Sequence, residues 1–192
     1  MKNFAEELVY WYLRFNGFFP LTNFVLHRQG LSDSNQSADA DLLAIRPKFV
    51  TEEVGRQHYD AALFRHFNSN TNIGLMCEVK SGNRVSLEKI HLKREDRIAY
   101  CLKRIGFFSE NKVRVHTEYL KSQCVSQGQF HEVGKVLVTK SEMNIPGFIC
   151  LSLDHIEAFI VERIRLFPSE KEGAKLHFDS DMLQYIIWKH GI

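Results

Sequence analysis

The chain has 192 residues, a hydrophobic fraction of 44% and a formal net charge of +2. This length suits one domain that buries roughly 70% of the surface of its extended chain, so the core needs no disulfide or metal to be stable. The sequence contains no apolar stretch long enough to cross a membrane. The small net charge gives no sign of nucleic-acid binding by composition alone, which leaves the distribution of charge to be examined.

The N-terminal residues and the cysteines indicate the cellular compartment of the protein. The first residues, MKNFAEEL, include two carboxylates where a secretory signal would need an apolar run, and this predicts a cytoplasmic protein. The four cysteines are widely spaced and form no CxxC pair, which argues against a zinc site and predicts reduced, mostly buried thiols. They are Cys77, Cys101, Cys124 and Cys150.

The first half of the chain predicts a helix followed by three strands. Residues 4–16 lie between a capping Asn3 and a terminating Gly17, and their apolar side chains cover most of the helix circumference. Strands are expected at 18–28, 40–46 and 73–80. The connection 48–72 is longer than a hairpin needs and is taken as an insertion, in which 59–67 is either a helical turn or a short extra strand.

The second half predicts mostly helices with two further strands. Helices are expected at about 93–105 and 109–124, strands at 133–139 and 147–153, and a helix at 155–167. Residues 168–192 form a C-terminal extension with a last helix near 180–189. The prediction is therefore one domain over 1–192, an α/β fold with a central four- to five-stranded mixed sheet flanked by helices.

The strand at 73–80 carries charge at its end. Side chains alternate along a strand, so Glu78 and Lys80 point to the same face. Grouped acid and amine side chains serve metal-assisted phosphodiester hydrolysis, but Glu-x-Lys is also a common exposed ion pair. If 40–46 pairs antiparallel with this strand, Asp41 lies beside Glu78 and Lys80. Asp41 could equally be an ordinary residue at the start of a strand.

A local excess of basic residues follows this strand between Arg84 and Arg104. It is the best candidate for a surface that contacts phosphates, although a solvated helix face with alternating charges explains the pattern as well. The candidate nucleic-acid-binding residues are Arg84, Lys89, Lys93, Arg94 and Arg97.

Three segments in this order resemble the PD-(D/E)XK nuclease superfamily, which has the restriction-endonuclease-like fold with an αβββαβ core. They read FAEELVYWYLRFNGF, ADLLAIR and CEVKSG. The likeness extends over most of 4–166. Ala40 stands where the family name has Pro, which weakens the motif more than the chemistry. The acid of the first helix is taken as Glu6 rather than Glu7.

The resemblance implies a metal-dependent endonuclease that hydrolyses DNA, with RNA not excluded. Asp41, Glu78 and the Val79 carbonyl would hold Mg²⁺, or Mn²⁺ in its place, because hard oxygen ligands suit these ions. Lys80 would position or help deprotonate the attacking water, and Glu6 would bind a second ion or a water. A homodimer is possible. The alternative is a nuclease-like module without catalytic activity that binds nucleic acid or a protein partner.

Overall fold

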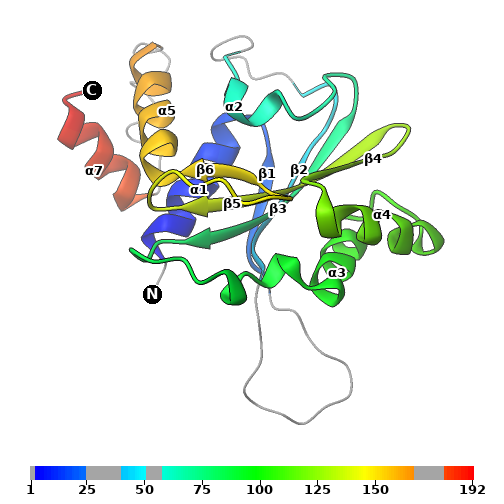
Figure 1. Ribbon diagram of the computed structural model, residues 1–192. Helices are drawn as coiled ribbons and strands as arrows, with labels where there is room; N and C mark the ends of the chain where they lie inside the picture. The colour runs from blue at the N-terminus through cyan, green and yellow to red at the C-terminus, as the bar shows by residue number, and fades with distance from the viewer. Residues whose placement is uncertain (1–2, 25–39, 51–57, 167–179) are drawn as a thin grey trace.

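A computed structural model of the chain describes residues 3–24, 40–50, 58–166 and 180–192, and the statements below concern these ranges (Figure 1). None of the helices in them is both long and apolar enough to cross a membrane. The helices are α1 (Phe4–Phe15), α2 (Ala61–Phe64), α3 (Glu95–Ile105), α4 (Glu110–Ser122), α5 (Leu153–Leu166) and α7 (Asp181–His190), with 3-10 turns η1 (Leu87–Lys89) and η2 (His91–Lys93). The strands are β1 (Phe19–Phe24), β2 (Ala40–Arg46), β3 (Asn72–Lys80), β4 (Val125–Gln127), β5 (His131–Thr139) and β6 (Ile149–Ser152).

The six strands form one mixed sheet. β1, β2 and β3 are antiparallel neighbours, and β5 runs parallel to β3 along its whole length. The other side of β5 is shared, because β4 pairs antiparallel with its first half and β6 pairs parallel with its second half. The carboxyl ends of β3 and β5 therefore lie together, beside the start of β2.

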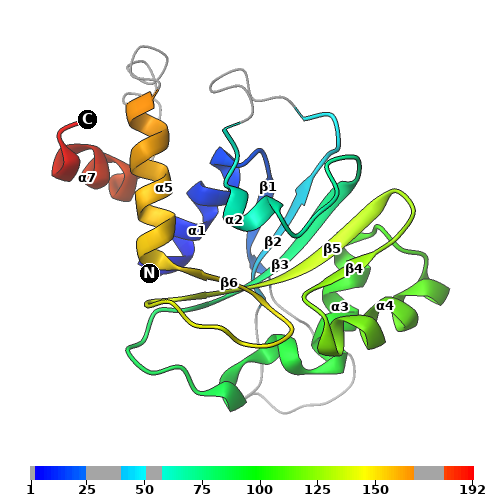
Figure 2. The same ribbon diagram turned by 45° about the horizontal axis from the view of Figure 1, so that its top comes forward.

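Each face of the sheet has its own hydrophobic core. α1, α2, α5 and α7 cover one face, where they pack on residues such as Leu75 and Val136. α3, α4 and the 3-10 turns cover the other face and pack on Met76 and Leu137 (Figure 2). Because side chains alternate along β3, every second residue belongs to the same face as Met76. Glu78 and Lys80 are on that α3 side.

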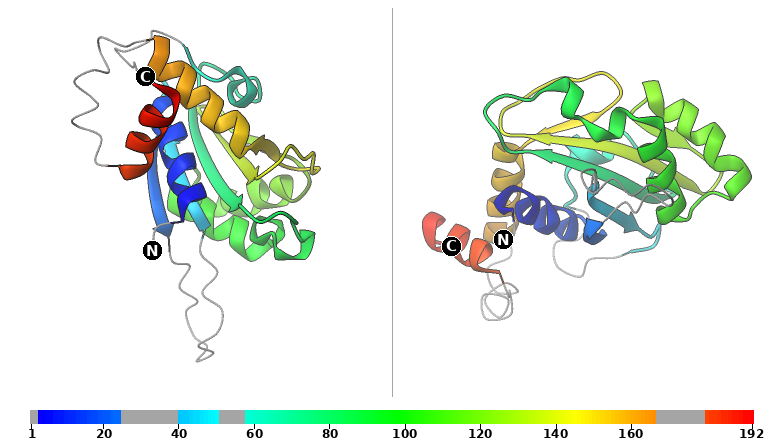
Figure 3. Two further views of the ribbon diagram at one scale, coloured as in Figure 1. Left: turned by 90° about the vertical axis from the view of Figure 1, so that its left-hand side faces the viewer. Right: turned by 90° about the horizontal axis from the view of Figure 1, so that it is seen from below.

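The first and last helices pack against each other. Asn3 caps α1 by accepting a hydrogen bond from the Ala5 N–H, and Ser180 caps α7 by accepting one from Leu183. The Ser180 hydroxyl also donates to the Glu7 carboxylate over 2.7 Å, which ties the start of α7 to α1. Figure 3 shows α7 lying beside α1 and α5 on the outside of this layer.

Most of the expected elements are present, with three differences. The sheet has six strands instead of four or five, because β4 is a strand of only three residues that no apolar run marks. The insertion 48–72 contains the short helix α2, which decides between the two alternatives for 59–67. Two 3-10 turns precede α3, which begins at Glu95. Of the four free thiols two are buried and two are half-buried. The end of the expected strand 18–28 and the first part of the C-terminal extension, residues 168–179, lie outside the described residues.

Candidate active site

The predicted site is where β2 begins and β3 ends. The antiparallel register pairs Leu42 with Cys77, and one step further along both strands brings Asp41 opposite Glu78. Residues opposite each other in an antiparallel pair project from the same face. Asp41 and Glu78 therefore share the α3 side of the sheet with Lys80, as strand alternation predicted.

The Glu78 carboxylate is almost fully buried, with 3% of its residue surface exposed, and it is bound from three directions. The Lys80 ammonium forms an ion pair with Oε1 at 2.8 Å. The backbone N–H of His91 donates to Oε1 over 2.9 Å, and that of Leu92 donates to Oε2 over 3.0 Å. These donors compensate for the loss of water around a buried charge. The backbone of the turn η2 thus fixes the Glu78 side chain.

Asp41 is less well compensated. Its Oδ2 accepts the Val79 N–H over 2.6 Å, and no other hydrogen bond reaches it within the described ranges. Burial raises the pKa of the Asp41 carboxyl to about 6, against the opposing effects of the Val79 hydrogen bond and the Lys80 charge. The negative charges of Glu6 and Glu78 raise it further. Such a carboxyl gains from any cation that enters its surroundings.

The structure distinguishes the two adjacent acids of α1. Glu6 acts on the pKa of Asp41 through its charge, which places its carboxylate near the site. Its Oε1 accepts a hydrogen bond from the Asn3 side chain over 2.8 Å. Glu7 instead binds Ser180 at the start of α7. The two acids thus differ in their surroundings, and the role of Glu6 stays a prediction.

The donor set is suited to a cation that needs few protein ligands. Within the described ranges, no three or more His, Cys, Asp or Glu side chains are grouped so as to hold a metal. Mg²⁺, however, keeps several waters and commonly binds through one or two carboxylates. Asp41 and Glu78, which repel each other in the absence of a cation, fit that requirement.

The five basic candidates differ in how their charges are used. Arg84, Lys89 and Lys93 are exposed, and none of them forms an ion pair with a carboxylate of the described residues. Arg94 is exposed but pairs with Asp96 through two hydrogen bonds, of 3.1 and 3.0 Å. Arg97 is buried, with 8% of its surface exposed, on the inner side of α3. The expectation that Arg97 faces a phosphate backbone is therefore not met, because its position on α3 turns it toward the sheet.

One further cation at this edge escaped the sequence analysis. Lys140 follows β5, whose last residue Thr139 pairs with Lys80 in the parallel register. The Lys140 ammonium donates to the Asn83 side chain over 2.7 Å and so links the segments that follow β5 and β3. The strand prediction for 133–139 already placed this lysine at a strand end, which is the signal that could have identified it.

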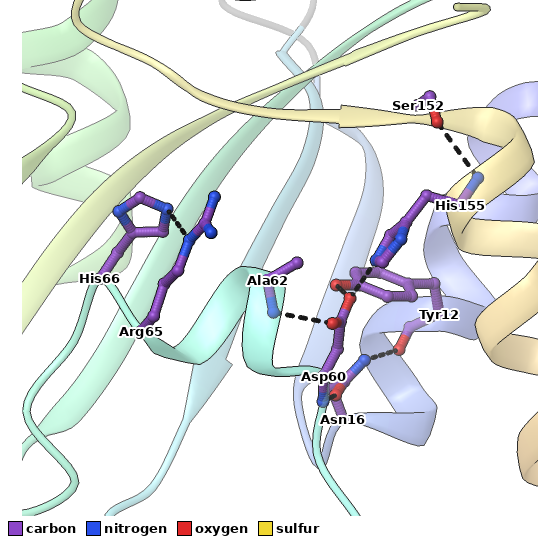
Figure 4. A network of polar contacts seen from close by, with 8 residues as sticks. All are labelled: Tyr12, Asn16, Asp60, Ala62, Arg65, His66, Ser152 and His155. Carbon is purple, nitrogen blue, oxygen red and sulfur yellow. Dashed lines mark hydrogen bonds and ion pairs between the residues drawn. The ribbon is translucent and has the colours of Figure 1, made fainter. Parts of the chain in front are cut away.

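A second polar centre lies on the opposite face, among α1, α2 and α5 (Figure 4). The Asp60 Oδ2 accepts hydrogen bonds from the Tyr12 hydroxyl at 2.5 Å and from the His155 ring at 2.7 Å. Its Oδ1 accepts the Ala62 N–H over 2.9 Å and so caps α2. Burial raises the pKa of Tyr12 well above its usual value, and the charge of Asp60 adds to the effect. Nothing in the sequence indicates this cluster, because its members are 48 and 95 residues apart.

Comparison with known proteins adds no relative to this description. The chain matches no protein-family model, no curated protein and no solved structure. The fold places the protein in the α/β class, with a six-stranded mixed sheet flanked by helices.

Proposed function

We propose that the protein is a Mg²⁺-dependent nuclease of the restriction-endonuclease-like type that hydrolyses DNA. The observation that carries the proposal is the pairing of β2 with β3, which brings Asp41 opposite Glu78, with Lys80 on the same face and Glu6 near Asp41. Three separate segments of the chain supply these groups. Such convergence of acids and an amine at one end of a sheet is typical of a site rather than of a surface ion pair.

Each group has a role that its surroundings support. Asp41 and Glu78 would hold the cation with the Val79 carbonyl, and Glu6 would bind a second ion or a water. A bound Mg²⁺ lowers the pKa of water at the site and neutralises charge that develops on the phosphodiester. Lys80 would orient the attacking water or move a proton from it, since the ion pair with Glu78 fixes its ammonium at this edge and leaves a quarter of the side chain exposed.

The substrate contact would be made by exposed cations that form no ion pair with a carboxylate among the described residues. Arg84, Lys89 and Lys93 lie on the segment after β3, and Lys140 follows β5 at the same edge. Lysine and arginine contacts to phosphates give affinity that depends on salt and little on base sequence. These four residues are therefore the proposed nucleic-acid interface, and Arg94 joins it only if its pair with Asp96 opens.

The test is cleavage of supercoiled and single-stranded DNA in Mg²⁺ and in Mn²⁺, with EDTA as the blank. We expect cleavage by the unaltered protein and none by Asp41→Ala or Glu78→Ala. Glu6→Gln and Glu7→Gln form a matched pair, because the two acids are adjacent in α1 but the charge of Glu6 acts on Asp41, whereas Glu7 binds Ser180. The absence of cleavage in both metals would count against the proposal. Equal effects of the two Gln variants would count against the role of Glu6.

The alternative function, a binding module without catalysis, has one observation in its favour. The Glu78 carboxylate already accepts two backbone N–H groups and pairs with Lys80, so the site is also stable as a purely structural ion pair. Calorimetric titration with Mn²⁺ separates the two functions. A module that only binds nucleic acid or protein should show no site for a divalent ion that depends on Asp41.

A further inference from the structure

The turn above Glu78 consists of two short 3-10 segments, η1 and η2, between β3 and α3. Exposed residues dominate it, but Ile90 and Leu92 are both 2% exposed and anchor it in the core on the α3 side. His91 lies between these two anchors. Its N–H and that of Leu92 point at the two oxygens of one carboxylate, thirteen and fourteen residues earlier in the chain.

The number of acceptor positions on Glu78 is limited. A carboxylate has about four lone-pair positions on its two oxygens. Within the part of the chain that the structure describes, Oε1 receives the His91 N–H and the Lys80 ammonium, whereas Oε2 receives only the Leu92 N–H. One position, on Oε2, is thus left for a further partner. Because the two N–H groups belong to an anchored backbone, the orientation of this position does not depend on a mobile side chain.

We infer that the backbone amides of His91 and Leu92 are positioning groups that fix Glu78 as a ligand with a single free acceptor position, on Oε2. The inference rests on the proposed function and adds a determinant of metal binding outside the ligands themselves. Groups that hydrogen-bond to a ligand orient it, and their loss typically costs about 10- to 100-fold in metal affinity. A turn with a merely structural role would affect stability but not the affinity for the ion.

A proline variant tests one of the amides. His91 is the first residue of η2, and Ile90 before it has φ −85° and ψ 105°, which is a backbone conformation that a following proline accepts. His91→Pro removes the N–H and places the ring where Glu78 Oε1 now lies, so the carboxylate must move. Within the described ranges the His91 N–H has no other acceptor.

The matched control is Leu87→Pro. Leu87 is the first residue of η1, it follows Ser86 at φ −82° and ψ 120°, and its N–H has no acceptor within the described ranges. Calorimetry should show the dissociation constant for Mn²⁺ raised by about 10-fold in His91→Pro and unchanged in Leu87→Pro. Equal affinities in the two variants would overturn the inference.

A measurement on variants without proline covers the case in which His91→Pro does not fold. In ¹⁵N-labelled protein without metal, Glu78→Gln should shift the amide resonances of His91 and Leu92 and leave that of Leu87 in place, because a charge-assisted bond is lost at only two of the three. Mn²⁺ is paramagnetic, so Mg²⁺ is used to test whether the same two resonances respond to the ion. If Mg²⁺ binds and they do not move, the inference fails. If no ion binds at all while Glu78→Gln moves them, the proposed function fails and the contact itself stands.

Discussion

Two carboxylates, the half-buried Asp41 on one face of the sheet and the buried Asp60 on the other, have opposite surroundings. Asp60 accepts three hydrogen bonds, from Tyr12, His155 and the Ala62 backbone. Asp41 accepts one, from the Val79 backbone, and faces two other acids. Burial and this repulsion raise the pKa of Asp41 to about 6.

We use this difference as a criterion for telling a structural acid from a candidate functional one. A buried carboxylate that is fully hydrogen-bonded stabilises the elements that supply its donors, whereas an under-compensated one costs stability that only a ligand recovers. By this criterion the Asp60 cluster joins α1, α2 and α5, although it contains the residue types of a catalytic site. Asp41 accepts fewer hydrogen bonds and is therefore the better candidate for binding a ligand.

The largest effect is expected at Asp60. Asp60→Ala leaves the buried Tyr12 hydroxyl and the Ala62 N–H without their acceptor, so urea denaturation should show a loss of about 3 kcal/mol in the free energy of unfolding. The control is Asp154→Ala, an exposed acid in the first turn of α5, for which we expect less than about 1 kcal/mol. A loss at Asp60 as small as that of the control would show that the network contributes little.

Lys135 extends the comparison to a buried cation, which forms no ion pair with any carboxylate in the part of the chain that the structure describes. It is 1% exposed, its ammonium lies 4.4 Å from the centre of the Phe148 ring, and burial lowers its pKa to about 8. The unfolded chain keeps this proton up to the usual value of 10.5. Between about pH 8 and 10.5 the unfolded state therefore binds more protons, and stability rises with pH.

Below about pH 8 both states are protonated and the full cost of the buried charge is present. We expect Lys135→Met to be more stable than the unaltered protein by about 2 kcal/mol at pH 7, with the difference shrinking as the pH rises from 8 to 10.5. Because both proteins contain the same cysteines, the effect of cysteine titration cancels in the difference between their free energies of unfolding at each pH. Exposed Lys112 on α4 is the control, and Lys112→Met should show no such pH dependence. A constant difference between Lys135→Met and the unaltered protein would contradict the shifted pKa.

Asp41 should respond in the opposite sense to Asp60. In EDTA at pH 8 the Asp41 carboxyl is ionised against its surroundings, so Asp41→Asn should raise the free energy of unfolding by about 1 to 2 kcal/mol. Adding Mg²⁺ should stabilise the unaltered protein and not the variant. The experiment is thermal unfolding of both proteins with and without the ion. Destabilisation of Asp41→Asn in EDTA would place Asp41 in the same class as Asp60.

The sequence predicts those parts of the site that follow from strand periodicity. Alternation and antiparallel pairing are sufficient to bring Asp41 beside Glu78, and the expected strand 40–46 has the observed bounds. The hydrogen bonds from His91 and Leu92 could not be predicted, because a backbone N–H is common to almost all residue types and its direction depends on the turn. The burial of Arg97, in contrast, could have been predicted. Arg97 is four residues before the buried Cys101, and helical spacing alone places both on the inner side of α3.

The smallest change in stability, with the most specific functional effect, is expected at Lys80. Lys80→Gln removes the cation of the pair with Glu78, but the Gln amide can donate to the carboxylate, which also keeps its two backbone hydrogen bonds. The loss of stability should therefore be about 1 kcal/mol. Affinity for Mn²⁺ should be retained or rise, since a competing positive charge is lost. Cleavage should nevertheless slow by about 100-fold or more if Lys80 orients water or moves its proton. Parallel calorimetry and cleavage assays separate these quantities. If affinity and rate fell together, Lys80 would act by orienting Glu78. Its role would then be structural, like that of His155, which donates a hydrogen bond to the buried Asp60.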